Sequence, residues 1–390
     1  MSNAIQIRGY IVGFGDCILL RLPDGTQTRH LLFDFGRAPN DGASLARFPD
    51  IAKNIEKQCN GHLDLLVMTH EHLDHMEGFY REREIFDRMQ VDRVWMSLPS
   101  APGYYSTFPK AKLQKKLREG LSGFARAARR NGLVIHPGFM SLLENNIANK
   151  DRVEYLRKLG TKPPAYLARG QGKAASAAFK NIGIRVLAPE PDVSVYYTAN
   201  ARENALTAAL AAASKTQDAD REGLAWDFPS VPRATDSEMG GLSRSDFERL
   251  RRTIREDGVA AARFIDRAQN NTSLCLLIEA GSKRLLMPGD AELESWDVMK
   301  KKCAADLKKP VDFLKVSHHG SHNGTPLELL DALLPVKRKA SAQVLVSTKR
   351  NVYGTKNPVP DTSLLTELER RCRKIVTTDG KTGTYVDLEF

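Results

Sequence analysis

Three histidines and one aspartate lie close together in segment 69–78, which reads Thr-His-Glu-His-Leu-Asp-His-Met-Glu-Gly. The apolar segment 63–68 before it predicts a buried strand, and the apolar spacing over 78–89 predicts a helix. The four side chains therefore follow the carboxyl end of a strand, where α/β folds place their ligand sites. Imidazole suits Zn, Fe or Mn, and a carboxylate extends the range to harder cations. Because one compact metal would use about three such groups, the segment predicts two adjacent metal ions. The alternative is a surface loop with chance histidines.

A second histidine-rich segment, His318-His319-Gly320-Ser321-His322, follows a predicted strand at 311–317. The two segments hold six of the nine histidines in the chain, which argues against a chance arrangement. A predicted hairpin over 272–290 ends on Gly289 and Asp290. His322 is an extra imidazole, and we expect it at the surface rather than among ligands. Three strand ends are thus expected to bring the candidate metal ligands to one edge of the fold: His70, His72, Asp74, His75, Asp290, His318 and His319.

A carboxylate also ends the predicted strand at 30–36, where Asp34 is followed by Phe35 and Gly36. Asp34 could simply cap this strand. The sharper interpretation places it beneath the histidine segment, where its hydrogen bond would orient one of the ligands.

The composition sets broad limits on the class of protein. At 390 residues with 42% hydrophobic content, the chain could hold one large domain or two ordinary ones. No apolar run approaches the ~18–20 residues needed to cross a bilayer, and no signal peptide opens the chain, so we expect no membrane span. Five scattered cysteines without a CxxC pair favour a reducing cytoplasm. The net charge of +11 favours an anionic partner, although many basic proteins bind no nucleic acid.

Two segments differ in character from the strand-rich remainder of the chain. Residues 100–179 are basic and mostly helical in pattern, with aromatic residues Tyr104, Tyr105 and Phe108 ahead of several lysines. Such a segment is either a solvated helix face or a surface for a nucleic-acid backbone with bases that can stack. Residues 191–269 are expected to form a helical and loop insertion that covers the site or mediates assembly, as a homo-oligomer or with a partner protein. We interpret both as elaborations within a single domain over 1–390.

The motifs resemble those of the metallo-β-lactamase superfamily, whose HxHxDH pattern matches residues 70–75 position by position. More narrowly, the chain resembles the hydrolase domain of ComEC-type DNA-uptake proteins, over about residues 5–99, 180–190 and 270–390. This resemblance implies an α/β fold, the αββα sandwich, with a two-metal site on one edge. The segments that carry the narrower resemblance are 12–16 (VGFGD), 271–274 (NTSL), 289–292 (GDAE), 314–321 (LKVSHHGS) and 378–380 (TDG).

The resemblance also implies a role for each candidate ligand. His70 and His72 would hold the first ion, Asp74 and His75 the second, and the Asp290 carboxylate would bridge both. The last ligand would be His318 or His319, and His319 is favoured because it stands next to the glycine. Two such ions, Zn or Mn, would lower the pKa of a bridging water. Asp74 would orient the resulting hydroxide or accept its proton, so that Asp74 and Asp290 are the expected catalytic residues.

This sequence departs from the superfamily pattern at two places. Residues 269–273 contain no histidine where many members carry one, as in ComEC-type sequences, which leaves the first position to an amide oxygen or water and favours Mn over Zn. Asn271 is expected beside the ligands in this segment. Asn357 stands where ComEC-type domains often place a histidine. Nearby, Lys349, Arg350 and Lys356 are either phosphate contacts or part of a solvated loop.

The expected function is metal-dependent hydrolysis of phosphodiesters by a nuclease. Because superfamily members also hydrolyse other esters, one alternative is a hydrolase of a small phosphoester or other ester, such as a nucleotide, choline phosphate or a thioester. The other is a non-catalytic scaffold that binds nucleic acid.

Overall fold

The structure is a computed structural model. It describes residues 4–39, 41–112, 114–116, 118–120, 122, 143–146, 149–171, 178–196, 239, 243–245, 248, 264–352 and 358–390. The chain divides into two compact units, the first made of residues 1–101, 150–191 and 270–390 and the second of residues 102–149 and 192–269. The predicted metal ligands all belong to the first unit.

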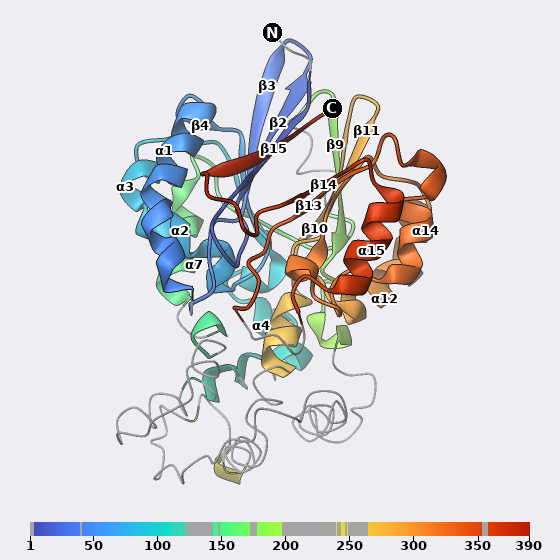
Figure 1. The fold of residues 1–390 in the computed structure, drawn as a ribbon. Coiled ribbons are helices and arrows are strands. Elements are labelled where there is room, and N and C mark those ends of the chain that lie inside the picture. Colours follow the sequence, from blue (N-terminus) through green and yellow to red (C-terminus); the bar gives the residue numbers. More distant parts are fainter. Residues whose placement is uncertain are drawn as a thin grey trace. The chain divides into compact units, whose positions relative to one another are not determined.

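Two mixed sheets form the centre of the first unit (Figure 1). In the first sheet, antiparallel pairing from β15 to β3 gives way to parallel pairing from β3 to β8. Its strands, in spatial order, are β15 (Tyr385–Glu389), β1 (Gln6–Tyr10), β2 (Ile18–Asp24), β3 (Gln27–Phe33), β5 (Leu65–Met68), β7 (Val94–Ser97) and β8 (Ala165–Leu167).

The second sheet is parallel from β14 to β11 and antiparallel from β11 to β9. Its strands, in spatial order, are β14 (Lys374–Thr377), β13 (Gln343–Val346), β12 (Phe313–Lys315), β11 (Lys283–Met287), β10 (Cys275–Ala280) and β9 (Ile182–Ala188). A separate pair joins β4 (His62–Leu63) and β6 (Gln90–Val91).

The strands bury apolar residues on both faces because alternate side chains point to opposite sides of a sheet. In β5, Leu65 and Val67 pack into the core between the two sheets, whereas Leu66 and Met68 pack against the outer helices. In the second sheet, Phe313 faces the same inner core and its neighbour Leu314 faces outward. The near-continuous apolar runs in the sequence follow from this double burial.

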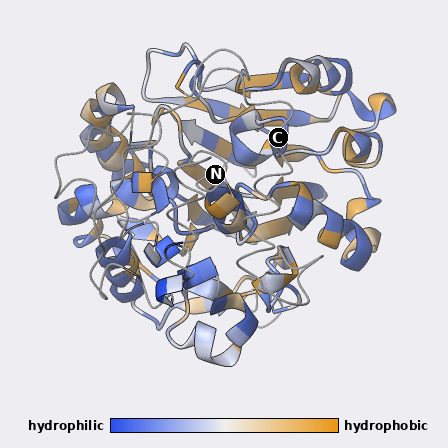
Figure 2. Cartoon of the chain, turned by 90° about the horizontal axis from the view of Figure 1, so that it is seen from below, coloured by the Kyte–Doolittle hydropathy of each residue, from blue (hydrophilic) through white to orange (hydrophobic). Residues whose placement is uncertain are grey.

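Helices cover the outer face of each sheet, which gives four layers in the order αββα (Figure 1). Hydrophilic and hydrophobic residues share these helices, as Figure 2 shows, in keeping with one face on the core and one in water. The predicted αββα fold class is therefore confirmed. The first sheet is covered by α1 (Phe48–Gln58), α2 (Leu73–Arg81), α3 (Arg83–Phe86) and α7 (Lys150–Leu159), and the second by α12 (Leu293–Lys302), α14 (Leu330–Leu333) and α15 (Thr362–Arg371).

Short helices complete the connections of the first unit. They are α13 (Ala304–Leu307) and the 3-10 helices η1 (Gly42–Arg47), η2 (Leu98–Ser100), η5 (Ser317–Gly320), η6 (Leu327–Leu329) and η7 (Val336–Arg338). In the second unit the structure describes α4 (Tyr104–Thr107), η3 (Pro109–Ala111) and η4 (Val193–Tyr196). Within the described parts of the chain, no helix is both long enough and apolar enough to cross a bilayer.

Segment 100–179 differs in part from the expected helical elaboration. Its later part supplies α7 and the strand β8, which pairs with β7 and so extends the first sheet. In the second unit, Tyr104 is only 3% exposed, its ring packs against Tyr105 and Phe108, and its hydroxyl accepts a hydrogen bond from Val193 N at 3.0 Å. Tyr104 therefore holds elements of this unit together and offers no face to a base. Most of the expected insertion 191–269, and the basic positions 126, 129 and 130, lie outside the described residues.

Candidate metal centre

The HxHxDH segment joins β5 to α2 and places its side chains at the edge of the first sheet. His72 has extended backbone angles and immediately precedes α2, so Asp74 and His75 fall in the first helical turn. Gly36 allows this turn to pack closely, because a Cβ at position 36 would lie 2.2 Å from the carbonyl oxygen of Leu73. The end of β3, with Asp34, therefore lies directly against the start of α2.

Asp34 holds the orientation of His75. Its carboxylate accepts hydrogen bonds from Thr69 N at 2.8 Å and Thr69 Oγ1 at 2.7 Å, and it lies 2.8 Å from His75 Nδ1. With Nδ1 held in this way, His75 Nε2 faces the second sheet and lies 3.0 Å from Asp290 Oδ2. A carboxylate behind a ligating imidazole is the usual device that fixes its tautomer and direction.

Asp290 comes from the second sheet, from the turn after β11. Gly289 has φ of +59°, a conformation that side chains other than glycine rarely adopt, and Asp290 N donates to Ser273 Oγ at 3.1 Å. The predicted Gly-Asp turn is thus fixed by backbone geometry and one hydroxyl. It directs the Asp290 carboxylate toward the histidines.

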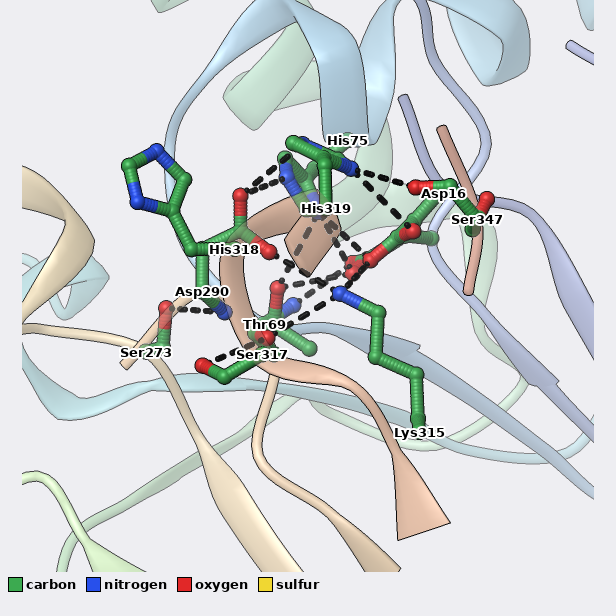
Figure 3. A network of polar contacts seen from close by, with 12 residues as sticks. Asp16, Thr69, His75, Ser273, Asp290, Lys315, Ser317, His318, His319 and Ser347 are labelled. Atoms are coloured by element: carbon green, nitrogen blue, oxygen red, sulfur yellow. Dashed lines mark hydrogen bonds and ion pairs between the residues drawn. The ribbon is translucent and has the colours of Figure 1, made fainter. Parts of the chain in front are cut away.

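His319 reaches the same carboxylate from η5 (Figure 3). Its Nε2 lies 3.0 Å from Asp290 Oδ2 and 3.4 Å from Asp74 Oδ2, while its Nδ1 lies 2.9 Å from the carbonyl oxygen of Ser347. Since a carbonyl oxygen only accepts, Nδ1 carries a proton and Nε2 faces the carboxylates. The ligand atoms of Asp74, His75, Asp290 and His319 all lie within 4.8 Å of one another, and all four residues are buried.

His318 points away from this group, as Figure 3 shows. Its Nδ1 lies 3.2 Å from Asn323 Oδ1 and 3.4 Å from Glu292 Oε1, and its Nε2 lies 3.3 Å from Asn270 Nδ2. Both His318 and His319 have positive φ, 47° and 54°, so the backbone turns sharply between them. Of the two candidates that the sequence left open, the structure brings His319 to the carboxylates.

His70 and His72 form a separate pair beside the four-residue group. His70 Nε2 lies 3.0 Å from His72 Nδ1, and His70 Nδ1 lies 3.1 Å from Thr69 Oγ1. Burial and the nearby His75 and His72 hold the pKa of His70 well below its ordinary value, so this imidazole is neutral and able to bind a metal. Among the described residues, no third His, Cys, Asp or Glu forms a compact group with the two nitrogens.

Lys315 and Asp16 are members of the site that sequence reasoning missed. Lys315 is 1% exposed, its Nζ lies 3.0 Å from Asp290 Oδ1 and 3.0 Å from the carbonyl oxygen of Gly289, and it forms an ion pair with Asp16. A signal was present in the sequence, because Lys315 is a basic residue within an otherwise apolar strand. A charge at such a position is buried only where an opposite charge meets it.

The electrostatics of the four-residue group suit a cation. Burial alone would lower the pKa of His319, but Asp290 and Asp74 outweigh it and raise that pKa to about 10. The same balance raises the pKa of His75 well above its ordinary value. Burial opposes ionisation of Asp290, yet His319, Lys315 and His75 hold the pKa of its carboxyl well below its usual range. Protons thus occupy nitrogens that a divalent ion would take, and the donor set of imidazole and carboxylate fits such an ion.

No family model and no curated protein sequence matches this chain. Among solved structures it is similar to the metallo-beta-lactamase fold protein YhfI from Bacillus subtilis, at 10% identity over 98% of this chain and 99% of that one. The TM-score is 0.35, too low to support a conclusion about activity or ligands. The fold assignment rests instead on the four layers, and the ComEC-type resemblance stays a prediction.

The remaining predicted site residues have other polar partners. Asn271 Oδ1 accepts hydrogen bonds from Glu292 N at 3.1 Å and Ser295 N at 3.0 Å, so Asn271 caps the start of α12. Lys349 pairs with the buried carboxylate of Asp41. Arg350 Nε lies 3.2 Å from Asp379 Oδ2, and its side chain is 61% exposed. Lys356 and Asn357 lie outside the described residues.

Proposed function

We propose that this protein is a metal-dependent hydrolase of phosphodiesters, and that its substrate is a nucleic acid. The observation that carries the proposal is the buried group of Asp74, His75, Asp290 and His319, drawn from both sheets, with the His70–His72 pair beside it. These residues fit divalent cations, either Zn or Mn. When bound, such ions polarise a phosphoryl oxygen and lower the pKa of a water molecule, which supplies a nucleophile near neutral pH.

The protein's own residues have distinct roles in this proposal. His70 and His72 would hold one ion, Asp74, His75 and His319 would hold the other, and Asp290 would contribute its carboxylate to both. Asp74 would also serve as the proton acceptor for the attacking water, because its carboxylate belongs to the same buried group.

The polymeric substrate is supported by charge. A net charge of +11 attracts polyanions, and a polymer with several phosphates gains more from it than a small ester does. Lys349 and Arg350 already have acidic partners in the structure, Asp41 and Asp379. A phosphate would therefore compete with these carboxylates, so that we assign the two residues a secondary role.

The test combines a substrate panel with one variant. Protein stripped of metal is supplied with Mn or Zn and offered single-stranded DNA, double-stranded DNA, RNA, mononucleotides and bis-p-nitrophenyl phosphate. We expect cleavage of polynucleotides, with an affinity that falls steeply as salt is raised. Asp290→Asn should abolish cleavage and leave salt-dependent binding in place.

Other outcomes assign other functions. Turnover of mononucleotides without polymer cleavage would identify a hydrolase of small phosphoesters. Salt-dependent binding without any turnover, in metal-loaded protein, would identify a nucleic-acid-binding scaffold. Cleavage that survives Asp290→Asn would refute the proposed metal chemistry.

A further inference from the structure

A second group of metal-ligating side chains lies at the other end of the first sheet. It consists of His62, Asp64 and Asp92, whose ligand atoms all lie within 4.8 Å of one another. Asp64 immediately precedes β5, whereas the histidine-rich segment 69–78 follows the end of β5. Since a strand rises about 3.3 Å per residue, β5 separates this group from the candidate metal centre by more than about 10 Å. The group is therefore a separate site.

The pairing of β4 with β6 explains why these side chains meet. The two short strands run parallel, with Leu63 opposite Val91, and both of these residues are buried in the core beneath the outer helices. Asp92 N donates to the carbonyl oxygen of Leu63 at 2.9 Å, so Asp64 and Asp92 follow their strands side by side. Because successive side chains of an extended chain alternate in direction, residues on either side of the two buried ones gather on the other side. His62 joins them there.

The ring nitrogen of His62 faces into this group. The His62 side chain is 40% exposed, yet its Nε2 atom is buried. Asp92 Oδ1 lies 3.1 Å from Nε2, but Nε2 forms no hydrogen bond with it or with any other described residue. Because this distance suits a hydrogen bond, the angle does not, so Nε2 is aimed beside the carboxylate oxygen rather than at it. A buried nitrogen without a partner is unfavourable, and a cation between the two groups would satisfy it.

The charge of the group suits a cation as well. Asp64 Oδ1 lies 2.8 Å from Arg29 Nη1, but the same guanidinium also pairs with Asp24 at 2.9 Å. Lys162 adds a positive charge near Asp92. Three carboxylates thus face two cationic side chains, and Arg29 neutralises only part of the charge of Asp64.

The donor set is that of a metal site with three protein ligands. Imidazole nitrogen and carboxylate oxygen bind Zn²⁺ at about 2.0–2.2 Å, and water takes a remaining position. The partial exposure of His62 leaves access for such a water molecule. A tetrahedral ion would draw the three ligand atoms to about 3.4 Å from one another, which lies within the separations already present.

We propose that His62, Asp64 and Asp92 form a separate site for a divalent cation of the Zn²⁺ class. The ion has a structural role, because it joins the connection that enters β5 to the connection that enters β7. This inference does not rest on the proposed function.

The experiment compares Zn²⁺ binding in equilibrium dialysis by the full-length, metal-stripped protein and by the variants Asp92→Asn and His62→Gln. Each variant should bind one ion fewer, or bind it at least about tenfold more weakly, because loss of even a group behind a ligand costs about 10–100-fold in metal affinity. Asp297→Asn is the matched control, because Asp297 is exposed and pairs with Lys300. Equal binding by the unmodified protein and both variants would overturn the proposal, as would an equal loss in the control.

Hydrogen exchange locates the ion. Zn²⁺ should slow amide exchange in β4 and β6 of the unmodified protein. Asp92→Asn should lose this protection and keep any protection that Zn²⁺ gives to segment 69–78. Protection of β4 and β6 that is unchanged in the variant would refute the assignment. Should Asp92→Asn not fold, His62→Gln supplies the same comparison, because the His62 side chain is partly exposed. Neither measurement needs turnover, so the outcome is separate from that of the proposed function.

Discussion

Replacing Lys315 by methionine tests a buried charge of the site. Lys315 is 1% exposed, and its ammonium contacts the carboxylates of Asp16 and Asp290, each of which is no more than 2% exposed. Lysine and methionine are both long and unbranched, so the exchange removes the charge without opening a large cavity. The expected effect is therefore electrostatic: two carboxylates are left buried without their shared cation.

The size of the effect follows from this burial. Removing one partner from a buried ion pair typically costs about 3–5 kcal/mol, because the remaining charge is neither solvated nor paired. His75 and His319 still face Asp290 Oδ2, so the loss falls mainly on Asp16 and on Asp290 Oδ1. A divalent ion in the four-residue group compensates part of it, and at 100 times its dissociation constant adds about 2.7 kcal/mol of stability.

The assay is urea unfolding of the Lys315→Met variant, once with EDTA and once with saturating Mn²⁺. Lys300→Met is the matched control, because Lys300 also pairs with two carboxylates, Asp297 and Glu328, at the surface. The control should change the free energy of unfolding by less than about 1 kcal/mol. A loss below about 1 kcal/mol for Lys315→Met in EDTA would refute the reasoning that this ammonium holds the acidic groups together.

Three further predictions concern the same region. Uptake of Mn²⁺ near pH 7 should release protons, because the pKa values of His75 and His319 are raised, the latter to about 10, whereas a metal needs neutral imidazole. Calorimetric titrations in several buffers should detect the released protons, and the affinity for Mn²⁺ should rise with pH. His319→Ala should lower Mn²⁺ affinity far more than His318→Ala does in equilibrium dialysis, and equal losses would contradict the observed geometry. Asn271→Ala should cost about 1 kcal/mol in urea unfolding through loss of the helix cap, and should leave metal stoichiometry unchanged.

The parts of the site that local sequence could predict are those fixed by neighbouring residues. The apolar run of β5, buried on both faces, predicts that the following histidines stand at a sheet edge. The Gly289–Asp290 pair predicts a turn, because glycine readily takes the positive φ observed there. Sequence could not separate His318 from His319 on local grounds alone. The sharp turn between them, with positive φ at both, sends the two rings in different directions.

Contacts between segments that are distant in the sequence could not be predicted from the sequence alone. Asp16 precedes β2 and Lys315 ends β12, and only the packing of one sheet on the other brings the two together. The sequence shows a lysine in an apolar strand but gives no means of identifying its partner. Tyr104 illustrates the converse: its aromatic ring beside lysines left a base-stacking surface open as one of two alternatives, whereas burial and the hydrogen bond from Val193 make it structural.

The buried charges also explain how the two sheets are joined at this edge. Asp16 and Asp34 belong to the first sheet and its connections, and Lys315 and Asp290 belong to the second. His75 lies between Asp34 and Asp290, so that each sheet supplies a carboxylate to one imidazole. Ion pairs buried this deeply add little net stability but are strongly unfavourable when mispaired, which restricts the sheets to one register at the site. The arrangement that gathers ligands for a cation is therefore the same arrangement that specifies how the sheets meet.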